Sequence, residues 1–188
     1  KLRGDWPQWF MFDSYGFKAD DCHGDIVFWP VKMVANYISQ TGDYSILLEE
    51  TPYSDGEKVS IKEHIINAIE AIETRFINPY NLISYQGGDW NDTLQPVHSE
   101  MKEKLSSSWV MGLAYDTINE LKEVILVVDE SLADRLTKIA EKINLGFHKY
   151  SMKNGIIAGF TYVRPDEIVE HMLHPSDENS GIKYRLIS

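Results

Sequence analysis

The segment Gly87-Gly88-Asp89-Trp90-Asn91-Asp92 contains the side chains best suited to chemistry in this sequence. Two adjacent glycines let the backbone come close to a ligand, and a tryptophan offers a flat apolar face. The two carboxylates and the amide can bond to hydroxyl groups. A pyranose presents C–H groups on one face and hydroxyls round its rim, so these residue types predict a sugar site. The alternative interpretation is an Asx-rich turn that caps the next helix.

An acid beside Trp90 would be partly removed from water. Such burial disfavours the charged form of a carboxyl group and raises its pKa, so that the group stays protonated at neutral pH. A general acid needs this property, because it must hold a proton until the leaving group takes it. The segment therefore has the composition of a site for acid-assisted bond cleavage.

Large apolar side chains crowd the start of the chain without helical or strand periodicity. This pattern predicts a packed loop that either lines a site or closes one end of a core. The residues concerned are Trp6, Trp9, Phe10, Met11, Phe12, Tyr15 and Phe17.

Four stretches with apolar residues three and four positions apart predict amphipathic helices. The first runs from Asp25 to Gly42-Asp43, where the glycine is a typical helix end. The second follows an isoleucine stripe from Ile61 to Phe76 and ends before Asn78-Pro79.

The third predicted helix contains Leu105, Trp109 and Leu121, with the serines 106–108 at its start. The fourth begins near Asp129 and reaches Phe147. After Gly155 a short β-rich run over residues 156–163 predicts a strand or a hairpin.

Amphipathic helices with little sheet predict an all-α fold built from helical hairpins. The loops between these helices are long, and long structureless loops are uncommon in compact domains unless they have a function. The aromatic loop and the glycine-rich loop are therefore the places where we expect the site.

The composition excludes several classes of protein. A formal net charge of −11 over 188 residues, without a run of Lys or Arg, disfavours nucleic-acid binding and suits an uncharged substrate. No stretch approaches the roughly 18 apolar residues that a membrane span needs. The single cysteine, Cys22, cannot form an internal disulfide, and with the lack of a signal peptide this indicates a cytoplasmic protein.

His23 stands near Asp20, Asp21 and Asp25, which could suggest a metal site. Acidic loops around an uncharged sugar have a simpler use, because their carboxylates can accept hydrogen bonds from its hydroxyls, so we expect no metal.

Four segments resemble, in the same order, the motifs of the cellobiose-phosphorylase family, glycoside hydrolase family 94. Residues 88–92 match its GDWND signature, and residues 24–30 resemble its Asp-Asp-Leu-Leu-Trp-Leu-Pro segment. Tyr37 with Thr41-Gly42-Asp43 resembles its next helix, and residues 108–112 match its Ser-Val-Trp-Leu-Gly helix. Residues 3–10, 174–177 and 181–185 look like the 1,2-beta-oligoglucan phosphorylase branch.

The resemblance implies an (α/α)6 barrel, or toroid, and an inverting phosphorolysis of β-linked, specifically β-1,2-linked, glucosides that yields α-glucose 1-phosphate. It implies that Asp92 is the general acid, that Trp90 contacts the sugar on the leaving side, and that Asp25 holds hydroxyls of the transferred glucosyl unit. Inorganic phosphate is then a co-substrate and no cofactor is expected. The family's phosphate ligands lie largely after the end of this chain, although Arg3 and Lys183 could join them.

Two departures from the family pattern concern the accepted linkage. Thr93-Leu94-Gln95 stands where the family commonly has Gly-Met-Asn, and Ala19 stands where it has an arginine.

The chain has no initiator Met and stops in an apolar stretch. We therefore expect residues 1–188 to be an internal fragment of a single (α/α)6-barrel catalytic domain, partnered by the rest of its parent chain, with a homodimer left open.

Two alternatives remain at this point. The chain could be a non-catalytic carbohydrate-binding helical domain that keeps Trp90 and Asp25. It could also belong to an inverting hydrolase on the same barrel, in which Asp25 or Asp89 activates a water.

Overall fold

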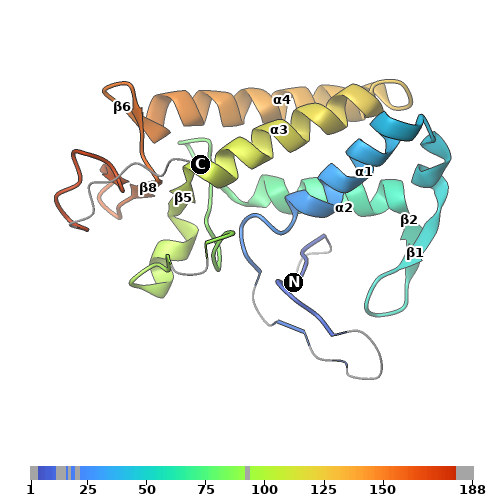
Figure 1. The fold of residues 1–188 in the computed structure, drawn as a ribbon, viewed down its shortest axis with the longest axis horizontal. Helices are drawn as coiled ribbons and strands as arrows, with labels where there is room; N and C mark the ends of the chain where they lie inside the picture. The colour runs from blue at the N-terminus through green and yellow to red at the C-terminus, as the bar shows by residue number, and fades with distance from the viewer. Residues whose placement is uncertain (1–3, 12–15, 17, 20–21, 92–93, 181–188) are drawn as a thin grey trace.

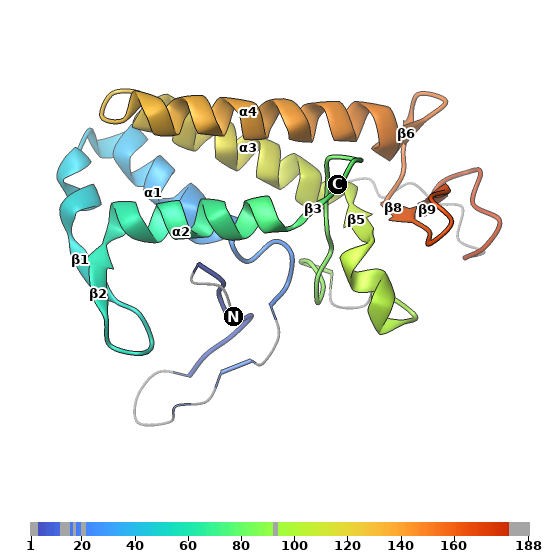
Figure 2. The same ribbon diagram turned by 180° about the vertical axis from the view of Figure 1, so that it is seen from behind.

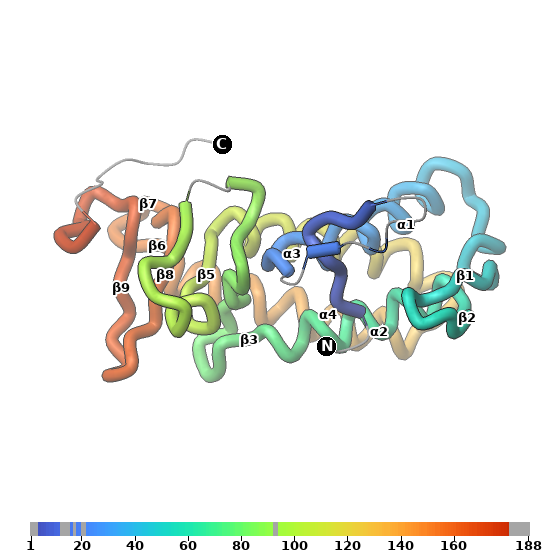
Figure 3. Tube along the Cα trace, turned by 90° about the horizontal axis from the view of Figure 1, so that it is seen from below, coloured from blue at the N-terminus to red at the C-terminus, as the bar shows by residue number. Residues whose placement is uncertain are grey.

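The computed structural model describes residues 4–11, 16, 18–19, 22–91 and 94–180. Among these residues four α-helices pack together, and a three-stranded sheet lies beyond one end of the helices (Figures 1 and 3). The helices are α1 (Phe28–Thr41), α2 (Ile61–Thr74), α3 (Ser108–Ile125) and α4 (Glu130–Gly146).

The four predicted helices are confirmed, with changes at their ends. α1 stops where Gly42 adopts a left-handed conformation, with φ of 68°, and its N–H donates to the carbonyl of Ile38. At the start of α4 the Asp129 carboxylate accepts from the backbone N–H of Leu132, as its position in the sequence predicts. After Gly146 the chain continues as a wider helical turn over Phe147–Ser151.

α3 is the centre of the helical part, because it packs against both α1 and α4 (Figure 2). Its inward face, which includes Met111, Ile118 and Leu121, is fully buried. Lys32 of α1 donates to Asp116 and Glu120 of α3 at 2.5 and 2.6 Å, so ion pairs add to the apolar contact at the rim. Surface pairs of this kind contribute little energy each, so the buried apolar face is the main source of cohesion.

Short antiparallel strands connect these helices. Two-stranded pairs are formed by β1 (Glu50–Pro52) with β2 (Lys58–Ser60), β3 (Phe76–Ile77) with β4 (Leu82–Ile83), and β6 (Met152–Lys153) with β7 (Ile156–Ile157). The three-stranded sheet has the order β5 (Leu105–Ser107), β8 (Phe160–Val163), β9 (Val169–Met172). Residues 156–163, predicted to form a strand or a hairpin, contain β7 and β8, but these strands do not pair with each other, because β7 pairs with β6 and β8 lies between β5 and β9.

The prediction of an all-α fold, as part of an (α/α)6 barrel with a short β element near the C-terminus, is wrong for this chain, because four small antiparallel sheets occur among its described residues. Phe76, taken as the end of the second helical stripe, pairs with Ile83 in a hairpin, and α2 ends at Thr74. Leu105 and Ser106, assigned to the third helix, are strand residues that pair with Tyr162 and Thr161. The physical reason is long-range pairing, because an apolar residue near a helix end fits either structure until a partner strand supplies its backbone hydrogen bonds.

Among the described residues no helix combines the length and the apolar character that crossing a membrane requires.

Candidate functional site

The two segments that the sequence singled out lie against each other. The N–H of Gly24 donates to the carbonyl of Gly88 at 2.8 Å, and the N–H of Gly87 donates to the carbonyl of Cys22 at 3.1 Å. His23 and Gln86 form an antiparallel bridge between them. The loop before α1 and the glycine-rich loop before β5 therefore form one unit.

Glycines are required where these segments touch. A Cβ on Gly24 would lie 2.8 Å from the carbonyl oxygen of Tyr85, and a Cβ on Gly88 would lie 2.9 Å from the imidazole of His23. Real Cβ atoms essentially never come so close to other heavy atoms. Gly88 was predicted to give a ligand access to the backbone, but in the structure its missing side chain makes room for His23.

Asp89 is buried and its carboxylate accepts hydrogen bonds at both oxygens. Oδ2 accepts from the hydroxyl of Ser107 at 2.8 Å. Oδ1 accepts from the backbone N–H of Asn91 at 3.0 Å and, more weakly, from the hydroxyl of Tyr85 at 3.4 Å. These donors tie the glycine-rich loop to the start of α3, because Ser107 also caps that helix by accepting from the N–H of Val110.

Asp25 is also buried, with only 3% of its surface exposed, but its bonding differs. Its Oδ2 accepts from the indole N–H of Trp29 at 3.1 Å, whereas Oδ1 is buried without a hydrogen-bond partner among the described residues. Burial raises the pKa of the Asp25 carboxyl, and the negative charge of Asp89 adds to this effect. The Trp29 hydrogen bond and the nearby His23 act in the opposite direction on the same pKa.

A buried carboxylate oxygen without a donor is costly, since a buried polar group normally finds a partner. Hydroxyl groups of a bound ligand would be suitable donors. Asp25 is therefore the described side chain in this region that is best prepared to accept a hydrogen bond from a substrate.

Trp90 points away from the loop that Asp89 anchors, and it is 57% exposed. The chain bends at Trp90, so Asp89 is buried while the next residue is exposed. The Trp90 ring lies 6.0 Å from that of Trp109 on α3, and Trp109 lies 6.1 Å from Trp29 on α1. The three indoles form a row that joins the two loops through both helices.

The residue predicted to be the general acid, Asp92, lies outside the described residues, as do Arg3 and Lys183. The described residues on either side of Asp92 are joined by a hydrogen bond, which the N–H of Leu94 donates to the carbonyl of Asn91 at 3.1 Å. The hydroxyl of Tyr85 also donates to the carbonyl of Leu94 at 2.7 Å. Burial, followed by the charge of Asp89, raises the pKa of Tyr85, so that its hydroxyl remains a hydrogen-bond donor.

Arg75 is a structural member of the site that sequence reasoning missed. Its buried guanidinium donates to the carbonyl of Gly24 at 3.1 Å and to the carboxylate of Asp5 at 2.5 Å. Arg75 therefore holds the loop before α1 in place through the backbone of Gly24. No signal in the sequence separates it from other basic residues at helix ends, because its partners are distant along the chain.

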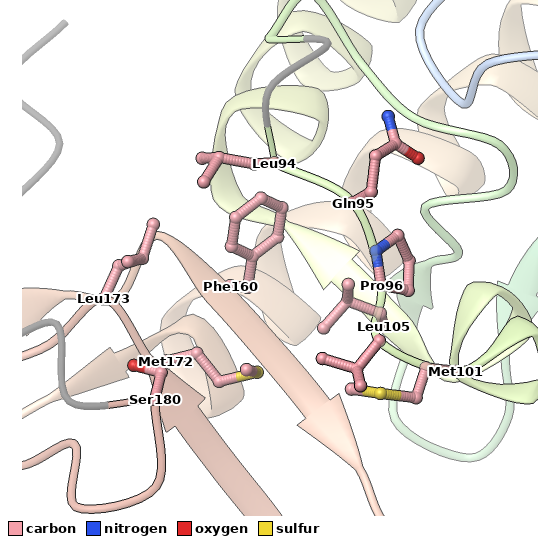
Figure 4. Close-up of a pocket in the computed structure, with 10 residues that line it drawn as sticks. Leu94, Gln95, Pro96, Met101, Leu105, Phe160, Met172, Leu173 and Ser180 are labelled. Carbon is pink, nitrogen blue, oxygen red and sulfur yellow. The ribbon is translucent and has the colours of Figure 1, made fainter.

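An apolar cavity of about 220 Å³ lies between the segment that follows Asp92 and the three-stranded sheet (Figure 4). Leu94, Phe160 and Met172 point into it, and the Gln95 side chain points away. Leu94 thus packs on the sheet where the family commonly has a methionine. The walls offer few polar groups, so this cavity does not have the chemistry of a sugar site.

Within the described part of the chain no group of three or more His, Cys, Asp and Glu side chains is placed to hold a metal ion. The imidazole of His23 packs against Gly88, and Asp20 and Asp21 lie outside the described residues.

The paired loops place a buried carboxylate oxygen without a partner in the described structure near an exposed tryptophan, and comparison with known families identifies the class of domain. The chain belongs to the glycosyl hydrolase 94 superfamily, whose catalytic-domain model matches residues 13–169. The family predicted from the four motifs is thereby confirmed.

Among curated relatives, the 1,2-beta-oligoglucan phosphorylase of Listeria innocua is 37% identical over 98% of this chain and 17% of its own length. The solabiose phosphorylase of Paenibacillus borealis is 31% identical over 61% of this chain and 15% of its own length. The chain therefore spans about one sixth of the relatives it matches. A solved structure, PssZ from Listeria monocytogenes, covers 79% of the chain and has 34% of its own length matched, with 12% identity and a TM-score of 0.43, a likeness too distant to bear on function.

Proposed function

We propose that this chain is part of an inverting glycoside phosphorylase that cleaves β-linked glucosides with inorganic phosphate and releases α-glucose 1-phosphate. Membership of the glycosyl hydrolase 94 superfamily supports the reaction class. The relative at 37% identity is named for β-1,2-linked oligoglucans, which supports the β-1,2 linkage as the substrate class.

The observation that carries this proposal is the unpartnered Oδ1 of Asp25, buried beside the signature loop. In the proposed site, hydroxyls of the transferred glucosyl unit donate to Asp25. Trp90 gives an exposed indole face to the sugar on the leaving side. Asp92, two residues further along, protonates the glycosidic oxygen as the bond to the anomeric carbon breaks.

Phosphate removes the need for a catalytic base. An inverting hydrolase needs a second carboxylate to activate a water, whereas phosphate is already an anionic nucleophile that attacks the anomeric carbon directly. Asp89, one of the two bases considered above for a hydrolase, is a poor candidate for that role because both its oxygens accept hydrogen bonds from the protein. We also propose that no metal or organic cofactor takes part, so that a chelator should leave the rate unchanged.

The test uses the full-length protein with sophorose, a β-1,2-linked glucose disaccharide. We expect glucose 1-phosphate to form in the presence of phosphate and no glucose release in phosphate-free buffer. Cellobiose, with a β-1,4 linkage, serves as the matched substrate for linkage and should react more slowly. Glucose release without phosphate would support the hydrolase instead, and binding of sophorose without turnover would support a carbohydrate-binding domain.

A further inference from the structure

Trp29 is placed to control the orientation of the Asp25 carboxylate. The two residues are four positions apart, on either side of the turn in which the N–H of Phe28 donates to the carbonyl of Asp25 at 3.0 Å. This spacing brings their side chains together at the start of α1. The indole N–H then bonds to Oδ2 and leaves Oδ1 free of protein donors within the described residues.

Core packing does not account for Trp29. Its side chain is 40% exposed, while its neighbour Phe28 is fully buried and belongs to the apolar core. The exposed indole is held from one side by Trp109 of α3, with ring centres 6.1 Å apart and planes tilted by 42°. A helix other than its own therefore fixes the direction in which the N–H points.

Trp109 also contacts Trp90, with ring centres 6.0 Å apart. The same indole thus touches the group that orients Asp25 and the exposed ring of the signature loop. Asp25 and Trp90 belong to loops far apart in the sequence, and this contact gives them a common support on α3.

We propose that Trp29 is a positioning residue, which orients Asp25 so that Oδ1 faces the glucosyl hydroxyls. We also propose that Trp109 holds the indole of Trp29 in a fixed position relative to that of Trp90. This inference rests on the proposed function and adds residues to which the sequence resemblance assigned no role. Loss of the indole N–H should let the carboxylate rotate and should remove a hydrogen bond that lowers its pKa, while burial and Asp89 continue to raise that pKa.

The test compares Trp29→Phe with Tyr37→Phe in the full-length enzyme. Tyr37 lies two turns further along α1, and its hydroxyl donates to Asp43 at 2.9 Å, so each variant keeps a ring and loses one hydrogen bond to a carboxylate. For Trp29→Phe we expect kcat/KM on sophorose to fall by roughly 10- to 100-fold, the range for a hydrogen bond to a charged group. Tyr37→Phe should stay within about 2-fold of the wild type, since a surface change has a small effect.

The second readout is the pH profile of kcat/KM. Because the Trp29 hydrogen bond lowers the pKa of Asp25, its loss should move the acidic limb to higher pH in Trp29→Phe and leave it in place in Tyr37→Phe. The position of this limb does not depend on how much enzyme is folded, so it is informative even if Trp29→Phe is less stable. A replacement that restores a ring N–H, Trp29→His, should recover part of the loss if the donor matters.

Wild-type enzyme is measured first. If it forms no glucose 1-phosphate, both the proposed function and the role of Trp29 are wrong. If it is active and Trp29→Phe keeps both its kcat/KM and its acidic limb, only the positioning role is overturned. A parallel loss in Tyr37→Phe would also overturn it, since the effect would then belong to the helix as a whole.

Discussion

At the scale of single residues, the site is defined by two buried aspartates with opposite bonding. Asp89 accepts three hydrogen bonds from the protein, and Asp25 keeps one oxygen without a partner in the described structure. The first arrangement stabilises a loop, and the second favours binding of a donor from outside. Composition alone treats these carboxylates as equivalent.

Asp92→Asn should keep the shape of the loop and remove the proposed proton donor. Turnover of sophorose should fall by roughly 10²–10⁴-fold, the usual contribution of a general acid, with little change in KM. Glucosyl fluoride, whose leaving group needs less protonation, should lose less activity. The matched control is Asp89→Asn, and the assignment of the acid is wrong if that variant, rather than Asp92→Asn, shows the selective loss.

Asp25→Asn should separate stability from function. Because the folded-state pKa of Asp25 is raised, the folded protein binds its proton more tightly than the unfolded chain does, and stability falls as pH rises from the unfolded to the folded pKa. The penalty is complete above the folded pKa. Asparagine should therefore raise the melting temperature at neutral pH, with a gain that disappears in acid, while KM for sophorose increases. An identical gain at all pH values would contradict this account.

At the scale of secondary-structure elements, the junction of β5 with α3 connects the site to the helical core. Ser107 ends the strand, caps the helix and bonds to Asp89. Gly24 and Gly88 let the loop before α1 pack against the loop before β5.

Ser107→Ala removes a helix cap and one donor to a buried carboxylate. It should lower the free energy of unfolding by about 2 kcal/mol, within the range for either loss. Ser106→Ala is the control, because Ser106 is equally buried and its hydroxyl has no partner in the described structure. Urea denaturation of both variants is the measurement, and equal effects would show that the Ser107 bonds do not matter.

Gly88→Ala should force the two loops apart, because the added methyl group would lie 2.9 Å from His23. We expect lower stability and a loss of kcat/KM together. Gly112→Ala is the matched change, since a Cβ there meets nothing within 4 Å and alanine favours a helix by up to about 1 kcal/mol. A Gly88→Ala enzyme with the stability and activity of the wild type would refute the close contact.

At the scale of the whole molecule, the region matched in these two relatives is 17% and 15% of their own length. Large side chains on the outer face of α1 are exposed, with Met33 at 71% and Tyr37 at 42%. We propose that the rest of the parent chain completes the site, including its phosphate ligands. The predicted role of residues 1–188 as a fragment of one catalytic domain remains a prediction.

The purified 188-residue piece should accordingly form no glucose 1-phosphate from sophorose and phosphate, under conditions in which the full-length protein does. Asp92→Asn in the full-length protein gives the background rate for the comparison. Phosphorolysis by the piece alone at a rate above that background would show that the phosphate ligands lie within these residues.

The sequence by itself determined the four helices and the family, and it singled out the loops before α1 and before β5, which the structure brings together. Apolar stripes and caps such as Gly42 and Asp129 are local signals, and a helix closes its hydrogen bonds within a few residues, so local patterns suffice to predict it. The motif of residues 88–92 identified the family without any structure.

Only the tertiary structure decided that Leu105 and Phe76 are strand residues and that Arg75, Ser107 and Tyr85 support the site. It also decided which buried aspartate keeps an unpartnered oxygen. Strand pairing and side-chain hydrogen bonds join residues that are distant along the chain, and their energy depends on burial and geometry that no local pattern specifies.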